Sequence, residues 1–585
     1  SNGPSAGLPR VYDLALEAIS HADGRVDPEC LSNFISAYQT VTPLKLGELW
    51  AIPIMLRLGL IENLRRVVVR IAVARSARNN AVYWAEKMTK TAEQKPENLI
   101  LAIADMARSN PPLASPFVAE LTRCLHGHGP ALALALSWME QRLSDANLTI
   151  EQLVRMENQQ QASNQVAMSN SIGSLRVLDS MNWRDFVEKM SVVEQTLIED
   201  PANIYAKMDF ATRDSYRHIV EKAAKTSPHS EAEIARQAIC LARDSAIREK
   251  GDTRKNHVGF YLIDKGLRQL EKTMQVRRTF ANSLPQICSC CPLTVYGGGS
   301  LLLTAALAGG LALQAYIEGL HGWPLGLLII LALFGSSHLV MALMNHLATL
   351  STTPRRLPRM DYSKGIPPEL RTLTVIPTII TSIENIEEQV KSLEIRFLAN
   401  RDDSLHFGLL TDFGDADRET LPEDKFLLQS IQQQIELLND KYRNESKDTF
   451  FLFHRPRRWN SQDQIWMGYE RKRGKLSDLN KLLRGKAGDN FSLIIGNRAI
   501  LLKVKFVITL DADTRMARDS ARQFVAAMAH PLNRAHYDKT RQRVTAGYGI
   551  LQPRVASSLS GADRSRYARM CANELGIDPY TRTVS

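Results

Sequence analysis

The chain has 585 residues, of which 44% are hydrophobic and 23% are charged. This length points to more than one domain, and the apolar fraction excludes a wholly disordered chain. Its seven cysteines exclude a disulfide-stapled scaffold, and their odd number fits a reducing compartment. The net charge of +11 is compatible with nucleic acid, an anionic membrane surface or a phosphorylated substrate as partner.

Residues 1–290 are predicted to form an all-α soluble leader domain. Apolar side chains recur there at helical spacings of three and four, as at Ile234, Ala238 and Leu241. No long segment alternates with a period of two, so few strands are expected in this part.

Residues 291–350 are predicted to form a transmembrane hairpin, with helices at about 295–317 and 325–347. The first run has no charged residue, and the second has only His338 and His346 as titratable groups. A bilayer core about 30 Å thick needs about 20 apolar residues in a helix, and each run has that length. The alternative is a pair of buried helices in a large soluble core.

The charges that flank this hairpin predict its orientation. Lys and Arg are missing from the short turn around Trp323, whereas arginines precede and follow the two apolar runs. These arginines are Arg277, Arg278, Arg355, Arg356 and Arg359. Because positive residues stay on the cytoplasmic side, both soluble parts are expected to be cytoplasmic.

Residues 351–585 are predicted to form an α/β domain with a mostly parallel, Rossmann-like sheet. Short runs rich in β-branched and aromatic residues at 372–376, 405–410, 449–453 and 506–510 are typical of strands. Helical patterns at 386–398 and 426–442 separate the first three of them, which indicates βαβ units. Ligands in such sheets bind at the carboxyl ends of the strands.

Two strands are followed by carboxylates. The run 507–510 leads directly into Asp511 and Asp513, whose spacing suits a hard divalent cation that bridges substrate phosphates. A solvated turn is the alternative, since Asp is common in turns. The run 405–410 leads to Asp412, Asp415 and Asp417, and one of these acids at the strand tip could accept hydrogen bonds from a nucleobase or ribose.

A basic block lies between these carboxylates in the sequence. From Arg455 to Lys486 there are ten Lys and Arg against three acidic residues. Cationic side chains beside a metal-binding carboxylate pair are what a diphosphate requires. A solvated lid or a membrane-facing patch is the alternative. A nucleic-acid role is not favoured, because the block shows no interleaved aromatic stacking platform.

Several motifs resemble those of known enzymes. Lys475-Leu-Ser-Asp-Leu-Asn480, Leu510-Asp-Ala-Asp513 and Gly549-Ile-Leu-Gln552-Pro553 resemble the Lys-x-x-x-Leu-Asn, D-x-D and Gln-Pro elements of inverting GT-A glycosyltransferases. The segments 47–57, 469–476 and 572–582 are more specifically similar to the cyclic β-1,2-glucan synthase family. The chain is therefore identified as resembling the leader, the hairpin and the first portion of the GT-A domain of that family.

This resemblance implies a function and a set of roles. The family uses UDP-glucose and a divalent cation, Mg²⁺ or Mn²⁺, to elongate a β-1,2-glucan that grows on the protein before cyclisation. It places the protein in the bacterial inner membrane as a multi-pass protein. By position, Asp412 would contact the uridine, and the remaining residues would contact the donor or its metal. These are Lys475 and Asn480 for the nucleotide-sugar, Asp511 and Asp513 for the diphosphate and metal, and Gln552 for the donor sugar.

The same resemblance leaves part of the catalytic machinery unaccounted for. Inverting transfer needs a general base, which relatives carry in a Thr-Glu-Asp-type motif that is missing from these residues. The GT-A domain is thus expected to be incomplete at its C-terminus and this fragment alone to be inactive. Two alternatives stay open, namely another processive β-glycan synthase of the cellulose-synthase type, or a membrane-tethered scaffold that binds nucleotide-sugars without catalysis.

Overall fold

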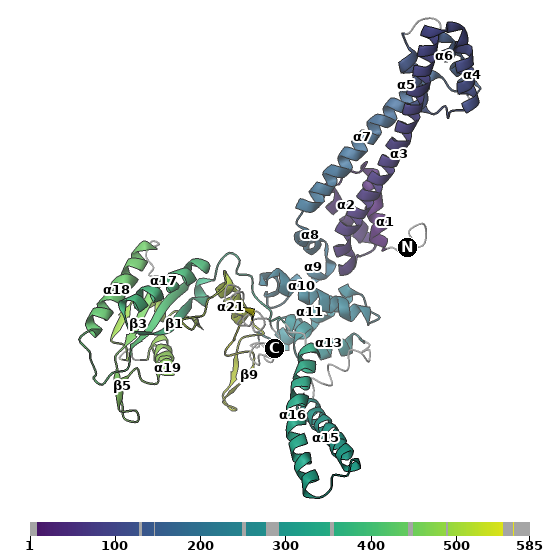
Figure 1. Cartoon of the computed structure of the whole chain (residues 1–585). Coiled ribbons are helices and arrows are strands. Elements are labelled where there is room, and N and C mark those ends of the chain that lie inside the picture. Colours follow the sequence, from purple (N-terminus) through teal and green to yellow (C-terminus); the bar gives the residue numbers. More distant parts are fainter. Residues whose placement is uncertain are drawn as a thin grey trace. The chain divides into compact units, whose positions relative to one another are not determined.

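A computed structural model describes residues 7, 9–127, 132–145, 147–248, 253–276, 292–351, 356–442, 449–486, 490–553 and 565–566 (Figure 1). The chain divides into two compact units, Ser1–Leu197 and Ile198–Ser585. The last helices of the predicted leader belong to the second unit, and the predicted leader boundary at residue 290 stays a prediction.

The first unit is helical, as predicted. Its helices are α1 (Arg10–His21), α2 (Pro28–Val41), α3 (Leu46–Gln94), η1 (Pro96–Asn98), α4 (Leu99–Ser109), α5 (Ser115–Leu125), α6 (Ala133–Ser144), α7 (Ile150–Ser180) and α8 (Trp183–Met190), with α9 (Val192–Ile198) at the boundary. A capping box of Thr149 and Gln152 begins α7. Near its other end, Ser174 Oγ donates a hydrogen bond to the Gly24 carbonyl (2.8 Å) and accepts one from the Val26 amide (2.7 Å).

The second unit begins with further helices. They are η3 (Tyr205–Lys207), α10 (Phe210–Lys225), α11 (Glu231–Arg248), α12 (Gly259–Ile263) and α13 (Leu267–Thr273). Asp200 organises this part, since its buried carboxylate accepts hydrogen bonds from His257 Nδ1 (2.8 Å) and from the Val258 amide (2.9 Å). The ring of His257 lies 5.4 Å from that of His530, which is far along the chain.

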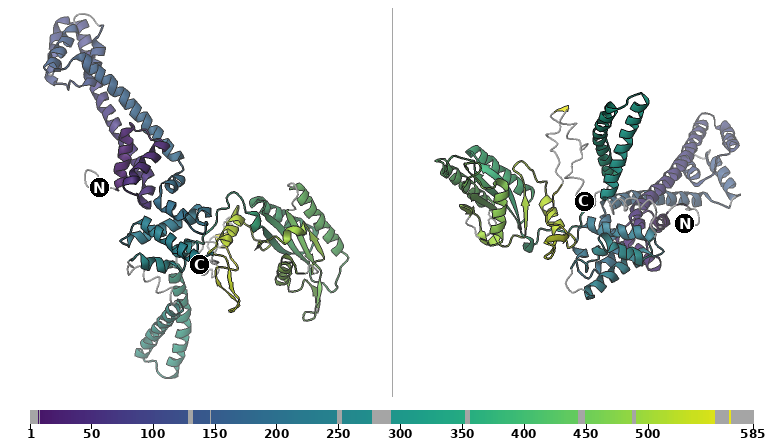
Figure 2. Two further views of the ribbon diagram at one scale, coloured as in Figure 1. Left: turned by 180° about the vertical axis from the view of Figure 1, so that it is seen from behind. Right: turned by 90° about the horizontal axis from the view of Figure 1, so that it is seen from below.

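The two apolar runs form long helices, α15 (Pro292–Ile317) and α16 (Trp323–Ser351), which lie side by side (Figures 1 and 2). Their most apolar windows have a mean hydropathy of 1.6 and 2.3, and only 6% and 11% of these windows is buried. A core helix of a soluble protein would be buried. Tyr296 Oη donates a hydrogen bond to Asn345 Oδ1 (2.7 Å), which ties the open end of the hairpin. Both helices therefore have the length and the composition to cross a membrane.

Residues 356–553 contain a five-stranded sheet in the order β6-β3-β2-β1-β7. Its strands are β1 (Thr372–Ile380), β2 (Leu405–Phe413), β3 (Phe450–Arg455), β6 (Leu493–Ile495) and β7 (Phe506–Thr509). Only β6 is antiparallel to its neighbour, so the prediction of a mostly parallel sheet is confirmed. Two small hairpins accompany the sheet, β4 (Arg458–Asn460) with β5 (Ile465–Met467), and β8 (His536–Asp538) with β9 (Arg543–Ala546).

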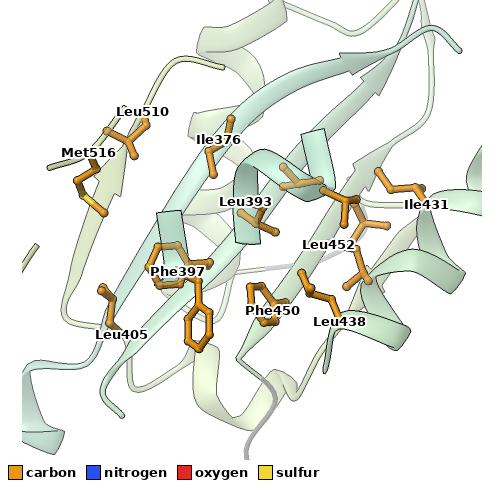
Figure 3. Close-up of a cluster of buried hydrophobic side chains, with 14 of the residues drawn as sticks. Ile376, Leu393, Phe397, Leu405, Ile431, Leu438, Phe450, Leu452, Leu510 and Met516 are labelled. Atoms are coloured by element: carbon orange, nitrogen blue, oxygen red, sulfur yellow. The ribbon is translucent and has the colours of Figure 1, made fainter. Parts of the chain in front are cut away.

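Helices cover both faces of this sheet. They are α17 (Ile383–Ala399), α18 (Asp424–Lys441), α19 (Arg471–Leu483), α20 (Arg498–Leu501) and α21 (Ser520–Ala529), with η4 (Pro368–Leu370) before β1. Because side chains alternate along a strand, Phe450 and Leu452 face α17 and α18, while Phe451 and Phe453 face α19 and α20. Figure 3 shows Phe397 of α17 packed over the first of these faces.

The segments on either side of the apolar hairpin contact each other within the second unit. The Asp361 amide donates a hydrogen bond to the Lys207 carbonyl (2.8 Å), and Arg359 forms an ion pair with Asp209 (3.1 Å). The residues before α15 and those after α16 therefore pack as one folded part.

Candidate functional site at the carboxyl ends of the strands

A buried ion network occupies the carboxyl ends of β2 and β3. Arg455 donates two hydrogen bonds to Asp412, from Nε to Oδ1 (2.9 Å) and from Nη2 to Oδ2 (3.0 Å), and its Nη1 contacts Asp478 (2.9 Å). Although burial opposes the charged form, these carboxylates raise the pKa of Arg455. The Arg455–Asp412 ion pair is bidentate, and this geometry fixes both side chains.

Lys475 of α19 completes this network. Its Nζ lies 3.1 Å from Asp412 Oδ2 and donates to the Thr378 carbonyl at the end of β1 (2.7 Å). Burial lowers the pKa of Lys475, and the charge of Asp412 offsets that effect in part. Asp412, Arg455 and Lys475 are each no more than 4% exposed. The visible role of Asp412 is therefore to hold two buried cations, and its contact with a uridine stays a prediction.

The backbone around the start of α19 requires glycine at two positions, Gly468 and Gly474. A side chain at Gly468 would place its Cβ 2.3 Å from Asp412 Oδ2, and one at Gly474 would place its Cβ 2.1 Å from the Tyr469 carbonyl. Glu470 and Arg471 both adopt left-handed conformations, with φ of 51° and 45°. The chain thus turns sharply between β5 and α19, which brings Lys475 over the ends of β1 and β2.

The predicted metal-binding residues follow β7, which lies next to β1. The Leu510 amide donates to the Val375 carbonyl (3.0 Å) and so extends the sheet up to Asp511. Buried Arg396 of α17 holds the loop from the other side, because its Nη2 donates to the carbonyls of Ala512 (2.7 Å) and Thr514 (2.8 Å). The backbone of the loop is thereby fixed, whereas the side chains of Asp511 and Asp513 are exposed.

The donor set of this loop is compatible with Mg²⁺ or Mn²⁺. Within the described part of the chain, no group of three or more His, Cys, Asp or Glu side chains is placed to hold a metal ion. Mg²⁺ keeps several waters and is often bound by one or two carboxylates together with substrate phosphates. Two exposed carboxylates on a fixed loop suit that kind of site, in which the metal would neutralise phosphate charge.

Cations of α19 and of the residues just after it line an open hollow. Lys472 forms an ion pair with Asp511. The same lysine lines a hollow of about 800 Å³. The lining residues are Lys472, Arg473, Leu476, Ser477, Asn480, Lys481, Arg484 and Lys486. Five of these are cationic, so the hollow favours an anionic group.

The two remaining predicted site residues, Asn480 and Gln552, are exposed. Asn480 is exposed and lines the hollow on the side of α19 away from Lys475. Gln552 is exposed and follows β9 without belonging to a strand. Among the described residues, no hydrogen bond or ion pair joins the side chain of either one to Asp412, Lys475 or Asp511. The motif at 572–582 lies outside the described residues.

Three contributors to the site escape sequence reasoning. Arg455 appears in the sequence only as a member of a basic block, and Lys472 only as a member of that block and of a family-like segment. Their partners become known once the strands are ordered. Arg396 lies within a helical pattern, and no local signal shows that it holds a loop more than a hundred residues away.

The fold and the site together define a protein with a helical N-terminal part, two apolar helices and a mixed α/β domain whose strand ends gather carboxylates and cations. No protein-family model matches the sequence. The chain is 33% identical to the cyclic β-(1,2)-glucan synthase NdvB of Rhizobium meliloti (strain 1021) over 583 residues, which are 99% of this chain. This match supports the assignment of the chain to the cyclic β-1,2-glucan synthase family. The chain spans 20% of the length of that relative.

Proposed function

We propose that the α/β domain binds UDP-glucose together with Mg²⁺ or Mn²⁺, and that it serves as the donor-binding part of an inverting glucosyltransferase. The enzyme would elongate a β-1,2-glucan, the polymer that the relative's name specifies. The observation that carries this proposal is the pairing of exposed Asp511 with Lys472, beside the buried network of Asp412, Arg455 and Lys475.

The charges of these residues suit a nucleoside diphosphate. The metal would be held by Asp511 and Asp513 and would neutralise part of the phosphate charge. Lys472 lines the basic hollow and would add a direct cationic contact to the phosphates. Lys475 is buried and would act through position, since it fixes the start of α19 against the ends of β1 and β2. Transfer also needs a general base, and no described residue is assigned to that role.

Thermal unfolding of the full chain in detergent tests this proposal. UDP with Mg²⁺ is expected to raise the unfolding temperature of the wild-type chain, because a molecule that binds only the folded state stabilises it. Asp511→Asn should abolish most of that rise. Asp417→Asn, which changes an exposed acid after β2, should leave it unchanged. A rise of equal size in wild type and Asp511→Asn, or one independent of the metal, would contradict the proposal.

We also propose that α15 and α16 cross the membrane as a hairpin with both soluble parts on the cytoplasmic side. Two features support this topology. The contacts of Asp209 and Lys207 with residues 359–361 require that the segments on both sides of the hairpin share one compartment. The turn near Trp323 has no Lys or Arg, whereas Arg356 and Arg359 follow the hairpin.

Cysteine labelling in sealed vesicles measures this topology. In a background without native cysteines, His321→Cys in the turn should react with a membrane-impermeant maleimide from the opposite side to Lys364→Cys. A chain that restores native Cys240 of α11 alone is the matched control, and it should label on the same side as Lys364→Cys. Labelling of all three positions from one side would rule out the transmembrane hairpin.

A further inference from the structure

We propose that Trp459 and Trp466 of the β4–β5 hairpin form the stacking surface for the nucleobase of the donor. This inference rests on the proposed function, because it concerns the same nucleotide. It assigns the base to an element that neither the motifs nor the resemblance singled out.

The two indole rings form one surface. Trp459 and Trp466 are directly opposite each other on the paired strands, so their side chains lie on the same face of the hairpin. The ring centroids are 5.8 Å apart at an angle of 58°. Trp459 is 49% exposed, and so much exposed aromatic area contributes little to the core.

The hairpin adjoins the buried ion network. Its second strand, β5, ends at Met467. At the next residue, Gly468, an added Cβ would lie 2.3 Å from Asp412 Oδ2. The hairpin therefore ends at the carboxyl end of β2.

The hairpin is also firmly attached to that end of the sheet. Trp466 and Ala416 exchange two backbone hydrogen bonds, each of 2.9 Å, and Ala416 lies four residues after Asp412. At the start of the hairpin, buried Arg457 is paired with Asp424 and donates to the Gly414 carbonyl (2.6 Å). The aromatic surface is consequently held in place before any molecule binds, which lowers the entropic cost of binding.

The order of the strands selects the nucleobase as the occupant. The hairpin follows β3 and is joined to the loop after β2, whereas Asp511 and Lys472 mark the end of β7. From β2 to β7 there are two strand spacings, or about 10 Å. A nucleoside diphosphate carries its base and its phosphates at opposite ends, so phosphates at Asp511 leave the base near the hairpin.

A glucan is the other molecule that aromatic rings commonly bind. The acceptor end of a glucan must reach the transferred sugar, which is attached to the phosphates on the side away from the base. The hairpin lies at the base end of this line, so the order of the strands does not favour the acceptor as its occupant.

Binding of UDP and of pyrophosphate to the full chain, each with Mg²⁺, tests the inference. Trp459→Ala should weaken UDP binding roughly tenfold, the effect of losing one base–aromatic stack, and should leave pyrophosphate binding unchanged. Trp459→Phe should retain most of the UDP affinity, because it keeps an aromatic face. Tyr537→Ala, which removes an exposed aromatic ring from the β8–β9 hairpin, should alter neither.

The outcomes separate this inference from the proposed function. Unchanged UDP affinity in Trp459→Ala, or an equal loss for UDP and pyrophosphate, would overturn the inference and leave the donor site standing. A loss of affinity for β-1,2-linked gluco-oligosaccharide with unchanged UDP binding would reassign the surface to the acceptor. Failure of the wild-type chain to bind either UDP or pyrophosphate would refute both.

Discussion

Asp412→Asn is expected to lower the free energy of unfolding of the α/β domain by about 3 kcal/mol, because it leaves buried cations without a compensating charge. Arg455 would keep Asp478 as a partner, whereas Lys475 would keep only carbonyl acceptors. The loss should appear as faster amide hydrogen exchange in β1, β2 and β3 of the full chain, measured by mass spectrometry.

The matched control is Asp415→Asn, three residues further along. Asp415 forms an ion pair of 2.8 Å with Arg471, but both side chains are partly exposed. Exposed pairs contribute about 0–1 kcal/mol, so exchange in the same strands should hardly change. Equal effects of the two substitutions would show that the buried network does not stabilise the sheet.

The second large effect is a loss of stability in acid that comes from His454 of β3. Its ring is buried, its Nδ1 lies 2.9 Å from Thr411 Oγ1, and its Nε2 has no hydrogen-bond partner among the described residues. Burial lowers the pKa of His454 to about 4, although Asp412 and Asp424 favour the charged form. The folded domain therefore holds this histidine neutral.

Proton linkage gives the direction in which stability changes with pH. Between pH 6.5 and pH 4 the unfolded chain binds a proton at His454 that the folded chain does not, so stability falls as the pH falls. The full loss for a shift of this size is about 3 kcal/mol. Urea unfolding followed by hydrogen exchange in β3 should show this slope in wild type and a smaller one in His454→Gln, in which buried His530, whose pKa burial lowers to about 2, still contributes. His536→Gln, at an exposed position of β8, should keep the wild-type slope.

The strands and helices of the sheet could be predicted because each has a strong local pattern. Phe506–Thr509 and Leu405–Phe413 are both strands of the sheet, and a carboxylate stands near the end of each, at Asp511 and at Asp412. The length and lack of charge of α15 and α16 likewise made two long apolar helices predictable. The carboxyl edge of the sheet followed from the βαβ pattern, which pointed to Asp412 and Asp511, whereas Lys475 was indicated by the resemblance to GT-A glycosyltransferases.

What could not be predicted depends on contacts between distant residues. The sequence shows ten cations between Arg455 and Lys486 but not that Arg455 and Lys475 are buried while Lys472 is exposed. Trp459 and Trp466 are seven positions apart, and only the pairing of β4 with β5 makes them one surface. The division at residue 197 leaves no mark in the sequence, because helical periodicity is the same on both sides of it.

The central claim is that Asp511 and Asp513 hold a divalent ion on the diphosphate of the donor. Electron–nuclear double resonance of Mn²⁺ with UDP and the full chain measures this most directly, since it detects phosphorus nuclei close to the metal. The account predicts a protein-bound Mn²⁺ signal coupled to phosphorus in wild type and its loss in Asp511→Asn. A phosphorus-coupled, protein-bound signal of undiminished strength in Asp511→Asn would contradict it.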